Sequence, residues 1–275
     1  MNSLPLDFLS PLQRKIIGVL LTLLALVLLP HLLAYGAGNT WVRTLDFALL
    51  YIMLALGLNI VVGYAGLLDL GYIAFYGLGA YVYALLSSPH LAYAFPQFFQ
   101  ATLAWSPWVI LPLGGLIAGI FGLILGAPTL KLRGDYLAIV TLGFGEIINI
   151  CLKNLYRPPL NLTNGPQGIS PVSSIESFGF SLGKPLTLFG YRMNDAFLHY
   201  YLFVVLLALI IVISMRLEKS RIGRAWMAIR EDEIAAKSIG IHTTRIKLLA
   251  FAMGASFGGV AGGLFASIQG TVSPD

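Results

Sequence analysis

Two kinds of polar residue in this chain have the type and position to do chemistry. The first kind interrupts long apolar runs and comprises Glu146, Asp69 and Asn59. A charged side chain at the centre of a bilayer costs about 2.5–3.5 kcal/mol, so such residues face a bundle interior or water and mark ion, proton or substrate pathways. We therefore predict these three as intramembrane polar residues, with Glu146 directed into the bundle or a wet cavity.

Two interpretations of Glu146 stay open. Its carboxylate either forms an interhelical hydrogen bond that fixes packing, with Asn59 and Asn149 as candidate partners, or lines the route of a zwitterionic substrate whose ammonium group it meets. Asp69 lies in GYAGLLDLG, residues 63–71. The glycines there indicate either an ordinary turn or a broken helix beside a pathway.

The second kind lies in a charged segment, residues 216–247, which holds eight of the seventeen Lys and Arg residues. Asp232 is positioned to cap a short helix, Glu233 adds negative charge to its first turn, and Gly240 allows a left-handed stop about two turns later. Such a helix is too short to be stable alone. It must therefore be held by tertiary or partner contacts.

The faces of this short helix predict what it contacts. Glu233 and Lys237 are four residues apart and are expected on its wet face. Ala235, Ala236 and Ile239 are expected to share a small apolar face that fits a groove of another protein. From the residues alone, the segment is either a docking loop for a soluble partner or a solvated linker whose charges only fix orientation.

Two sequence motifs for catalysis are missing from the chain. It contains no GxxxxGKS/T phosphate loop and no HExxH, so any ATP hydrolysis must take place in another chain. The single cysteine, Cys151, excludes an intrachain disulfide and a cysteine metal cluster. We therefore expect no enzymatic activity and no cofactor in this chain. The four histidines are expected to be ordinary solvated side chains: His31, His90, His199 and His242.

The composition requires a membrane. Hydrophobic residues make up 57% of the chain and charged residues 11%, against about a quarter charged in soluble domains. Runs close to the roughly 20 residues that cross a bilayer as a helix recur at 16–35, 44–62, 67–87, 107–127, 136–155, 198–216 and 248–268. Helices satisfy their own backbone polar groups in lipid, so we predict one all-α polytopic membrane domain, residues 1–275, with about seven transmembrane helices.

Basic residues set the orientation of these helices. With a cytoplasmic N-terminus, twelve Lys and Arg residues lie inside and five outside. The segment 216–247 is then cytoplasmic, and the long loop 156–197 is external, where it is suited to receive a substrate-delivering protein. The first span has an alternative interpretation as a cleaved signal peptide, because Arg14 and Lys15 precede it and small residues follow.

Glycines at intervals of four predict close helix packing. Gly254, Gly258 and Gly262 form one stripe in the last span, and Gly115 and Gly119 form another in the fourth.

Several segments resemble the LivM-type permeases of bacterial branched-chain amino acid ABC importers. They are GLNIVVGYAGLLDLGYIAFYGLGAY (57–81), LKLRGDYLAIVTLGFGEI (130–147), NGPQGIS (164–170), GRAWMAIREDEIAAKSIGI (223–241) and RIKLLAF (245–251). EDEIAAKSIGI (231–241) is similar to the EAA coupling motif that docks on the ATPase subunit of such importers. The resemblance implies that the coupling loop comprises Asp232, Glu233, Ala235, Ala236, Ile239 and Gly240.

The resemblance runs from about residue 45 to the end, apart from a stretch near 88–106. It implies a multi-pass permease of the bacterial inner membrane. The implied partners are a LivH-type second permease, two cytoplasmic ATPases and a periplasmic binding protein. Permeases of this family continue with further helices after a GxVSPxSF-like segment, so the chain is expected to be a C-terminally truncated form.

The expected function is inward transport of branched-chain or other neutral amino acids, driven by ATP hydrolysed in partner subunits. Two alternatives remain open. One is a permease of the same family for urea or short amides. The other is an ion-coupled secondary transporter that uses Asp69 and Glu146 and has no need of an ATPase-docking loop.

Overall fold

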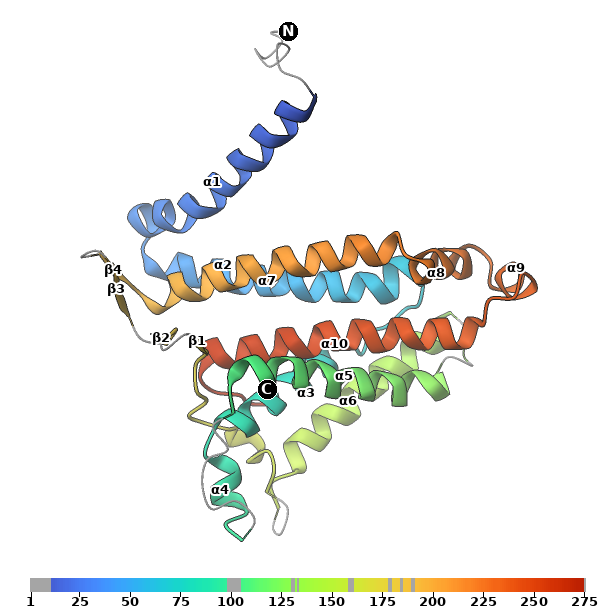
Figure 1. Cartoon of the computed structure of the whole chain (residues 1–275). Coiled ribbons are helices and arrows are strands. Elements are labelled where there is room, and N and C mark those ends of the chain that lie inside the picture. The colour runs from blue at the N-terminus through green and yellow to red at the C-terminus, as the bar shows by residue number, and fades with distance from the viewer. Residues whose placement is uncertain are drawn as a thin grey trace.

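The computed structural model describes residues 11–97, 105–129, 132, 134–157, 161–177, 180–183, 185–188 and 191–274. Within them, helices dominate (Figure 1). They are α1 (Pro11–Ala37), α2 (Asn39–Asn59), the π-helix η1 (Ile60–Tyr64), α3 (Ile73–Ser87), α4 (His90–Ala94), α5 (Pro107–Thr129), α6 (Asp135–Asn154), the 3₁₀ turn η2 (Gly165–Gln167), α7 (Asp195–Glu218), α8 (Arg221–Glu231), α9 (Glu233–Ser238) and α10 (Thr243–Gln269).

Five of the described helices are long and apolar enough to cross a membrane: α2 continued by η1, α5, α6, α7 and α10. Two shorter apolar stretches, Leu24–Gly36 and Ile73–Ser87, coincide with the first and third predicted spans. The predicted all-α polytopic membrane fold is confirmed. The third span is shorter than predicted, because residues 65–72 form a non-helical connection and α3 begins only at Ile73. At 1.5 Å per residue, its 15 residues cover only about 22 Å.

The last helix, α10, is the centre of the bundle and packs against α5, α3 and α2. The predicted glycine stripe of α10 lies in this packed face. A β-carbon on Gly262 would collide with the backbone carbonyl of Tyr76, and one on Gly259 would lie 2.6 Å from Cβ of Ala118. In α5, Gly119 faces Ser256 of α10 in the same way. Because these glycines carry no side chain, the backbones approach closely enough to pack without a solvent-driven hydrophobic force.

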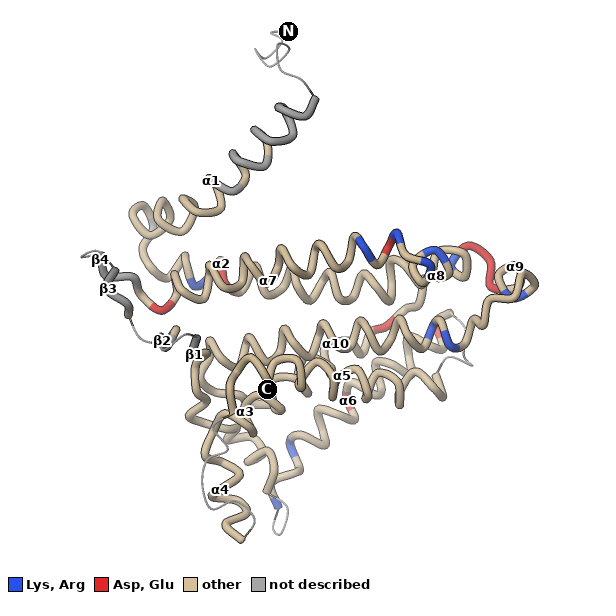
Figure 2. The backbone as a smooth tube through the Cα atoms, viewed as in Figure 1, with Lys and Arg blue, Asp and Glu red and all other residues tan. Residues whose placement is uncertain are grey.

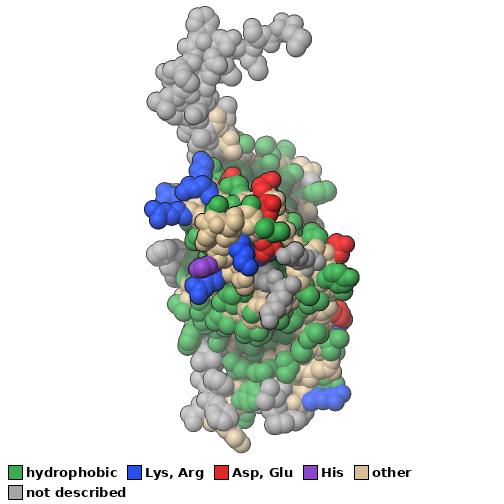
Figure 3. All heavy atoms as spheres, turned by 90° about the vertical axis from the view of Figure 1, so that its right-hand side faces the viewer, with side chains coloured by type: hydrophobic (Ala, Val, Ile, Leu, Met, Phe, Trp, Pro, Cys, Tyr) green, Lys and Arg blue, Asp and Glu red, His purple; other side chains and the backbone are tan. Residues whose placement is uncertain are grey.

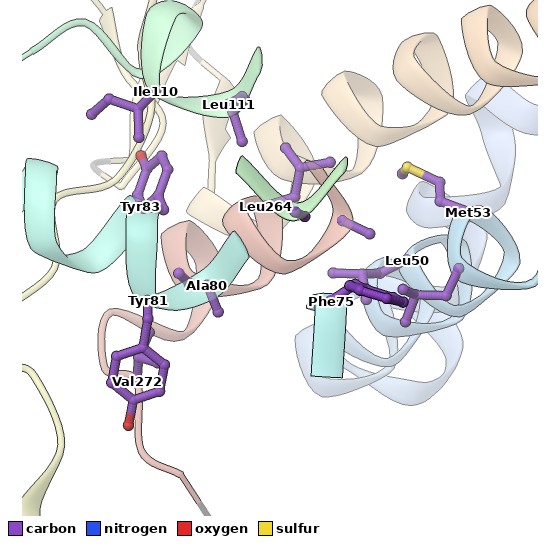
Figure 4. Close-up of a cluster of buried hydrophobic side chains, with 14 of the residues drawn as sticks. Leu50, Met53, Phe75, Ala80, Tyr81, Tyr83, Ile110, Leu111, Leu264 and Val272 are labelled. Atoms are coloured by element: carbon purple, nitrogen blue, oxygen red, sulfur yellow. The ribbon is translucent and has the colours of Figure 1, made fainter. Parts of the chain in front are cut away.

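Larger side chains fill the space beside these contacts. Leu50 and Met53 of α2, Phe75 of α3, Ile110 of α5 and Leu264 of α10 are all at most 1% exposed and belong to one cluster (Figure 4). A second layer is formed by α2 and α7, which lie side by side (Figure 1). The first helix joins this layer through α7, since the hydroxyls of Tyr200 and Tyr201 donate to the carbonyls of Leu26 and Val27 at 3.0 and 3.1 Å.

Connections fall at two opposite ends of the bundle (Figure 1). One end carries α8, α9 and the end of η1, and most of the described Lys and Arg residues gather there (Figure 2). The other end carries part of the loop 156–197, with η2 and two short antiparallel hairpins, β1 (Glu176–Ser177) with β2 (Phe180–Ser181) and β3 (Leu186–Leu188) with β4 (Tyr191–Met193). The sequence did not predict these hairpins.

Candidate functional site

The charged segment 216–247 folds into the end of α7, two short helices and the start of α10. Asp232 ends α8 and caps α9, because its Oδ1 accepts from the backbone N–H groups of Ile234 and Ala235 at 2.7 and 3.0 Å. Gly240, at φ +91, follows α9 in a conformation that favours glycine. The predicted cap and the predicted left-handed stop are both confirmed, and they fix the ends of α9.

Lys237 is exposed, as expected for the wet face, whereas Glu233 is only partly exposed. Oε2 of Glu233 accepts from Nζ of Lys247 on α10, at 2.6 Å. Lys247 is 8% exposed, and a buried ammonium group is costly without a charged partner. Lys237 is exposed, so water can solvate its ammonium group. The pair of Glu233 and Lys247 fastens α9 to the central helix.

The predicted apolar face of α9 is also partly wrong. Ala236 points inward and is 2% exposed, whereas Ala235 and Ile239 remain exposed. Successive helical residues are 100° apart, so Ala236 takes the inner side when Ala235 faces outward. Ile234 of α9 and Ile239, the residue that follows α9, are 72% and 75% exposed, and they are large apolar side chains offered to solvent. Figure 3 looks at this end and shows basic groups on one side and acidic groups on the other.

The helix α8, which precedes α9, was not predicted from the sequence. Ser220 Oγ accepts from the backbone N–H of Gly223 at 3.1 Å and caps it. Trp226 is fully buried and its Nε1 donates to the carbonyl of Ile246 at 2.7 Å. The spacing of Ile222, Trp226 and Ile229 at intervals of four and three was the available signal for an amphipathic helix.

The glycine-rich segment forms a non-helical break, residues 65–72, between η1 and α3, which fits both interpretations of this segment. Asp69 in this break is 6% exposed, and its Oδ1 accepts from the N–H of Gly71 at 2.9 Å. The N–H of Leu70 donates to Oγ1 of Thr141 at 3.1 Å, which joins the break to α6. Asp69 therefore shapes the loop that carries it. Asn59 is exposed and lies just before η1.

Glu146 lies on α6, close to this junction. A β-carbon on the neighbouring Gly145 would lie 3.3 Å from Cα of Gly71. We predicted that Glu146 faces the bundle interior or a wet cavity; its side chain is exposed on the surface of this chain and lines the pocket described next. The reason is that α6 buries only 28% of its most apolar stretch and packs along one edge.

Glu146 and Asn149 nevertheless line one pocket, with a volume of about 330 Å³, between α3, α6 and residues 272–274. Its remaining walls are mostly apolar. No hydrogen bond joins Glu146 to Asn59 or Asn149 among the described residues, and Oδ1 of Asn149 is buried there without a partner. The pocket combines an apolar lining, one carboxylate and one amide, which suits a small molecule with an apolar part and a donor group.

Two residues near the start of α2 and the start of α7 are polar and buried, which the sequence did not predict. Asp46 of α2 is 1% exposed, and neither of its carboxylate oxygens has a hydrogen-bond partner among the described residues. His199 of α7 is 4% exposed and its Nδ1–H donates to the carbonyl of Asp195 at 2.9 Å, so its predicted solvation is wrong. His31 packs edge-on against Phe197, with ring centroids 5.2 Å apart.

The known proteins that are similar to this chain are described as permeases of branched-chain amino acid transport systems. Residues 41–275 match the family described as branched-chain amino acid transport system, permease component. The chain is 41% identical, over 97% of its length, to a protein of Escherichia coli named high-affinity branched-chain amino acid transport system permease protein LivM. It is 40% identical over the same share to the Salmonella typhimurium protein of that name. It covers 60% of the length of each relative.

A more distant relative is the Salmonella typhimurium permease protein LivH of the same named system, at 24% identity over 82% of this chain and 68% of the relative. No solved structure gives a significant match. The family match covers most of the chain and includes the helix break, α6, α8 and α9. The chain belongs to the family of permease components of branched-chain amino acid transport systems.

Proposed function

We propose that this chain is the transmembrane permease subunit of an ABC importer that moves branched-chain or other neutral amino acids into a bacterial cell. ATP is hydrolysed in separate ATPase subunits, and the chain itself carries no cofactor. The proposal extends from the relatives, whose names specify a branched-chain amino acid transport system. The whole of residues 1–275 then acts as one permease domain in the inner membrane.

The observation that carries the ATP-driven mechanism is the geometry of α9. A helix of six residues is not stable alone, yet this one is capped by Asp232, stopped at Gly240 and tied to α10 by Glu233. These contacts hold Ala235 and the two exposed isoleucines in a fixed outward position. A rigid helix end with exposed apolar side chains suits insertion into a groove of a soluble partner.

In this proposal, Ala235 and Ile239 contact the ATPase, and Ile234 joins them. Ala236 packs α9 inward, while Asp232, Glu233 and Gly240 set its shape. The ATPase side is cytoplasmic, which agrees with the basic residues around α8 and with the positive-inside rule. The opposite end, with the loop 156–197, then receives a periplasmic binding protein, and a LivH-type permease completes the membrane unit.

Glu146 is the proposed pathway residue. A carboxylate exposed on a membrane helix is too costly to leave in lipid, so α6 must face water or another protein subunit there. The pocket beside Glu146 offers an apolar wall to a branched side chain and a carboxylate to an ammonium group. Asp69 and Asn59 act indirectly, through the shape of the break.

Co-purification from native membranes tests the proposal. The tagged full-length protein should bring ATPase subunits with it, and Ala235→Asp should remove them while leaving membrane insertion intact, because it puts an unpaired charge into the groove contact. Thr244→Asp is the matched control, since it adds the same charge at an exposed position of the same end outside α9. Retention of the ATPases by Ala235→Asp would reject α9 as the docking helix.

Uptake measurements then decide the substrate and the energy source. Leucine, a polar neutral amino acid and urea should be compared as competitors in the reconstituted importer. Leucine is expected to compete most strongly. Uptake that follows an ion gradient without ATP would instead favour a secondary transporter.

A further inference from the structure

Arg230 of α8 donates a hydrogen bond to a backbone carbonyl at the end of η1. The chain leaves the helix after Tyr64, so the last carbonyls lack their usual helical donors. The N–H groups of Ala65 and Leu67 bond to the carbonyls of Ile60 and Val61. The carbonyl of Gly63 instead accepts from Nη1 of Arg230 at 2.6 Å. A guanidinium here also meets the negative end of the helix dipole.

The same arginine contacts the first residues of the break. Gly66 has φ +67, and a β-carbon on it would lie 2.5 Å from Cγ and 3.1 Å from Cβ of Arg230. The backbone of the break therefore rests directly on the aliphatic stem of Arg230. The guanidinium holds the end of η1 and the stem supports the chain that follows.

Arg230 lies between the two regions that the proposed mechanism uses, which are the docking helix α9 and the pocket beside α6. Two residues later, Asp232 caps α9. In the other direction, the break continues to Leu70, whose N–H bonds to Thr141 of α6, five residues before Glu146. Arg230 is thus a short link between the exposed helix α9 and the helix that carries the pocket.

The link has the mechanical properties that transmission needs. The hydrogen bond from Trp226 to the carbonyl of Ile246 joins α8 to the start of α10, so α8 is held as a rigid unit. The side chain of Arg230 is 45% exposed, so water can replace its bond to Gly63 when α8 shifts. A contact between two packed elements that can be made and broken is suited to a two-state change.

We propose that Arg230 is a positioning residue that couples movement of α9 to the helix break at residues 65–72 and, through the break, to α6. The inference rests on the proposed function of α9 as the ATPase-docking helix. It predicts that loss of the Arg230 side chain uncouples ATP hydrolysis from transport, with both partial reactions still present.

The test uses the complete importer, with both permeases, the ATPases and the binding protein, reconstituted in liposomes. The readout is the number of substrate molecules taken up per ATP hydrolysed, for parent and Arg230→Ala. Arg230→Ala is expected to keep ATP hydrolysis and to lower this ratio by about fivefold or more, the lower end of typical coupling between sites.

Two control variants separate the bond to Gly63 from general effects of charge. Arg224→Ala removes another exposed arginine of α8, whose Nη1 donates to the nearby carbonyl of Lys219 at 2.9 Å. Glu231→Gln removes the carboxylate that pairs with Nη2 of Arg230 at 3.1 Å and leaves the contact with Gly63. Both controls should keep the parent ratio.

The outcomes are distinguishable. An Arg230→Ala importer with the parent ratio overturns the inference, and so does one whose uptake and hydrolysis fall together in proportion to the amount of assembled complex. If this variant does not assemble, the same ratio in Arg230→Gln decides, because glutamine is too short to keep both contacts. A parent complex without ATP-driven uptake would reject the proposed function instead.

Discussion

Lys247 in the second turn of α10 and Glu233 at the start of α9 form an ion pair, with 2.6 Å between Nζ and Oε2. The lysine is nearly buried, and the glutamate side chain is 34% exposed. The pair joins the helix that is central to the bundle to the short helix that projects from it. It therefore determines where α9 lies relative to the membrane-spanning helices.

The first prediction concerns this ion pair. Glu233→Gln leaves a nearly buried ammonium group without its charged partner and should lower the free energy of unfolding by about 1–3 kcal/mol. Thermal unfolding in detergent measures the change. Lys237→Met should have little effect, because Lys237 is exposed and its ammonium group is solvated by water. Equal destabilisation by Lys237→Met and Glu233→Gln would contradict the assignment.

The second prediction concerns the contact between α10 and α3. Gly262→Ala should lower the free energy of unfolding by roughly 1–3 kcal/mol, because the added carbon meets the backbone of Tyr76 and Ala80, which cannot move as a side chain can. Gly143→Ala has no atom within 4 Å of the added carbon. It should be neutral or stabilising by up to about 1 kcal/mol. Melting temperatures of the two variants would show whether the glycine stripe is structural.

The third prediction concerns orientation. Gln167 in the loop 156–197 and Lys219 between α7 and α8 are both exposed. Because that loop and α8 lie at opposite ends of the bundle (Figure 1), single cysteines at the two positions should react with a membrane-impermeant thiol reagent from opposite sides of the membrane. Cys151 is exposed and must be removed first. Labelling of both positions from the same side would show that the number of crossings between them is wrong.

The fourth prediction concerns the pocket on α6. Glu146→Gln keeps the shape and hydrogen bonding of the side chain and removes its charge. If the carboxylate meets the ammonium group of the substrate, uptake should fall by roughly tenfold, which corresponds to about 1.4 kcal/mol. Assembly and ATP hydrolysis should be unchanged. Glu176→Gln, in the loop 156–197, is the control, and parent-like uptake by Glu146→Gln would remove Glu146 from the pathway.

The sequence was sufficient for features that depend on local chemistry. Apolar runs of bilayer length predicted the membrane helices, because lipid offers no partner to an unpaired backbone group. The glycine stripe of α10 predicted its packed face, and Asp232 with Gly240 predicted both ends of α9. These predictions hold because each depends on residues within a few turns of one another.

Tertiary structure decided the features that depend on distant residues. Glu233 pairs with Lys247, 14 positions along the chain, and Ala236 turns inward, because α10 packs on one side of α9. Glu146 lies on the outside of the chain, since α6 contacts its neighbours along one edge only. Arg230 reaches Gly63 across 167 positions of sequence. No local pattern specifies such contacts, because they arise only when the packing of whole helices brings the two ends together.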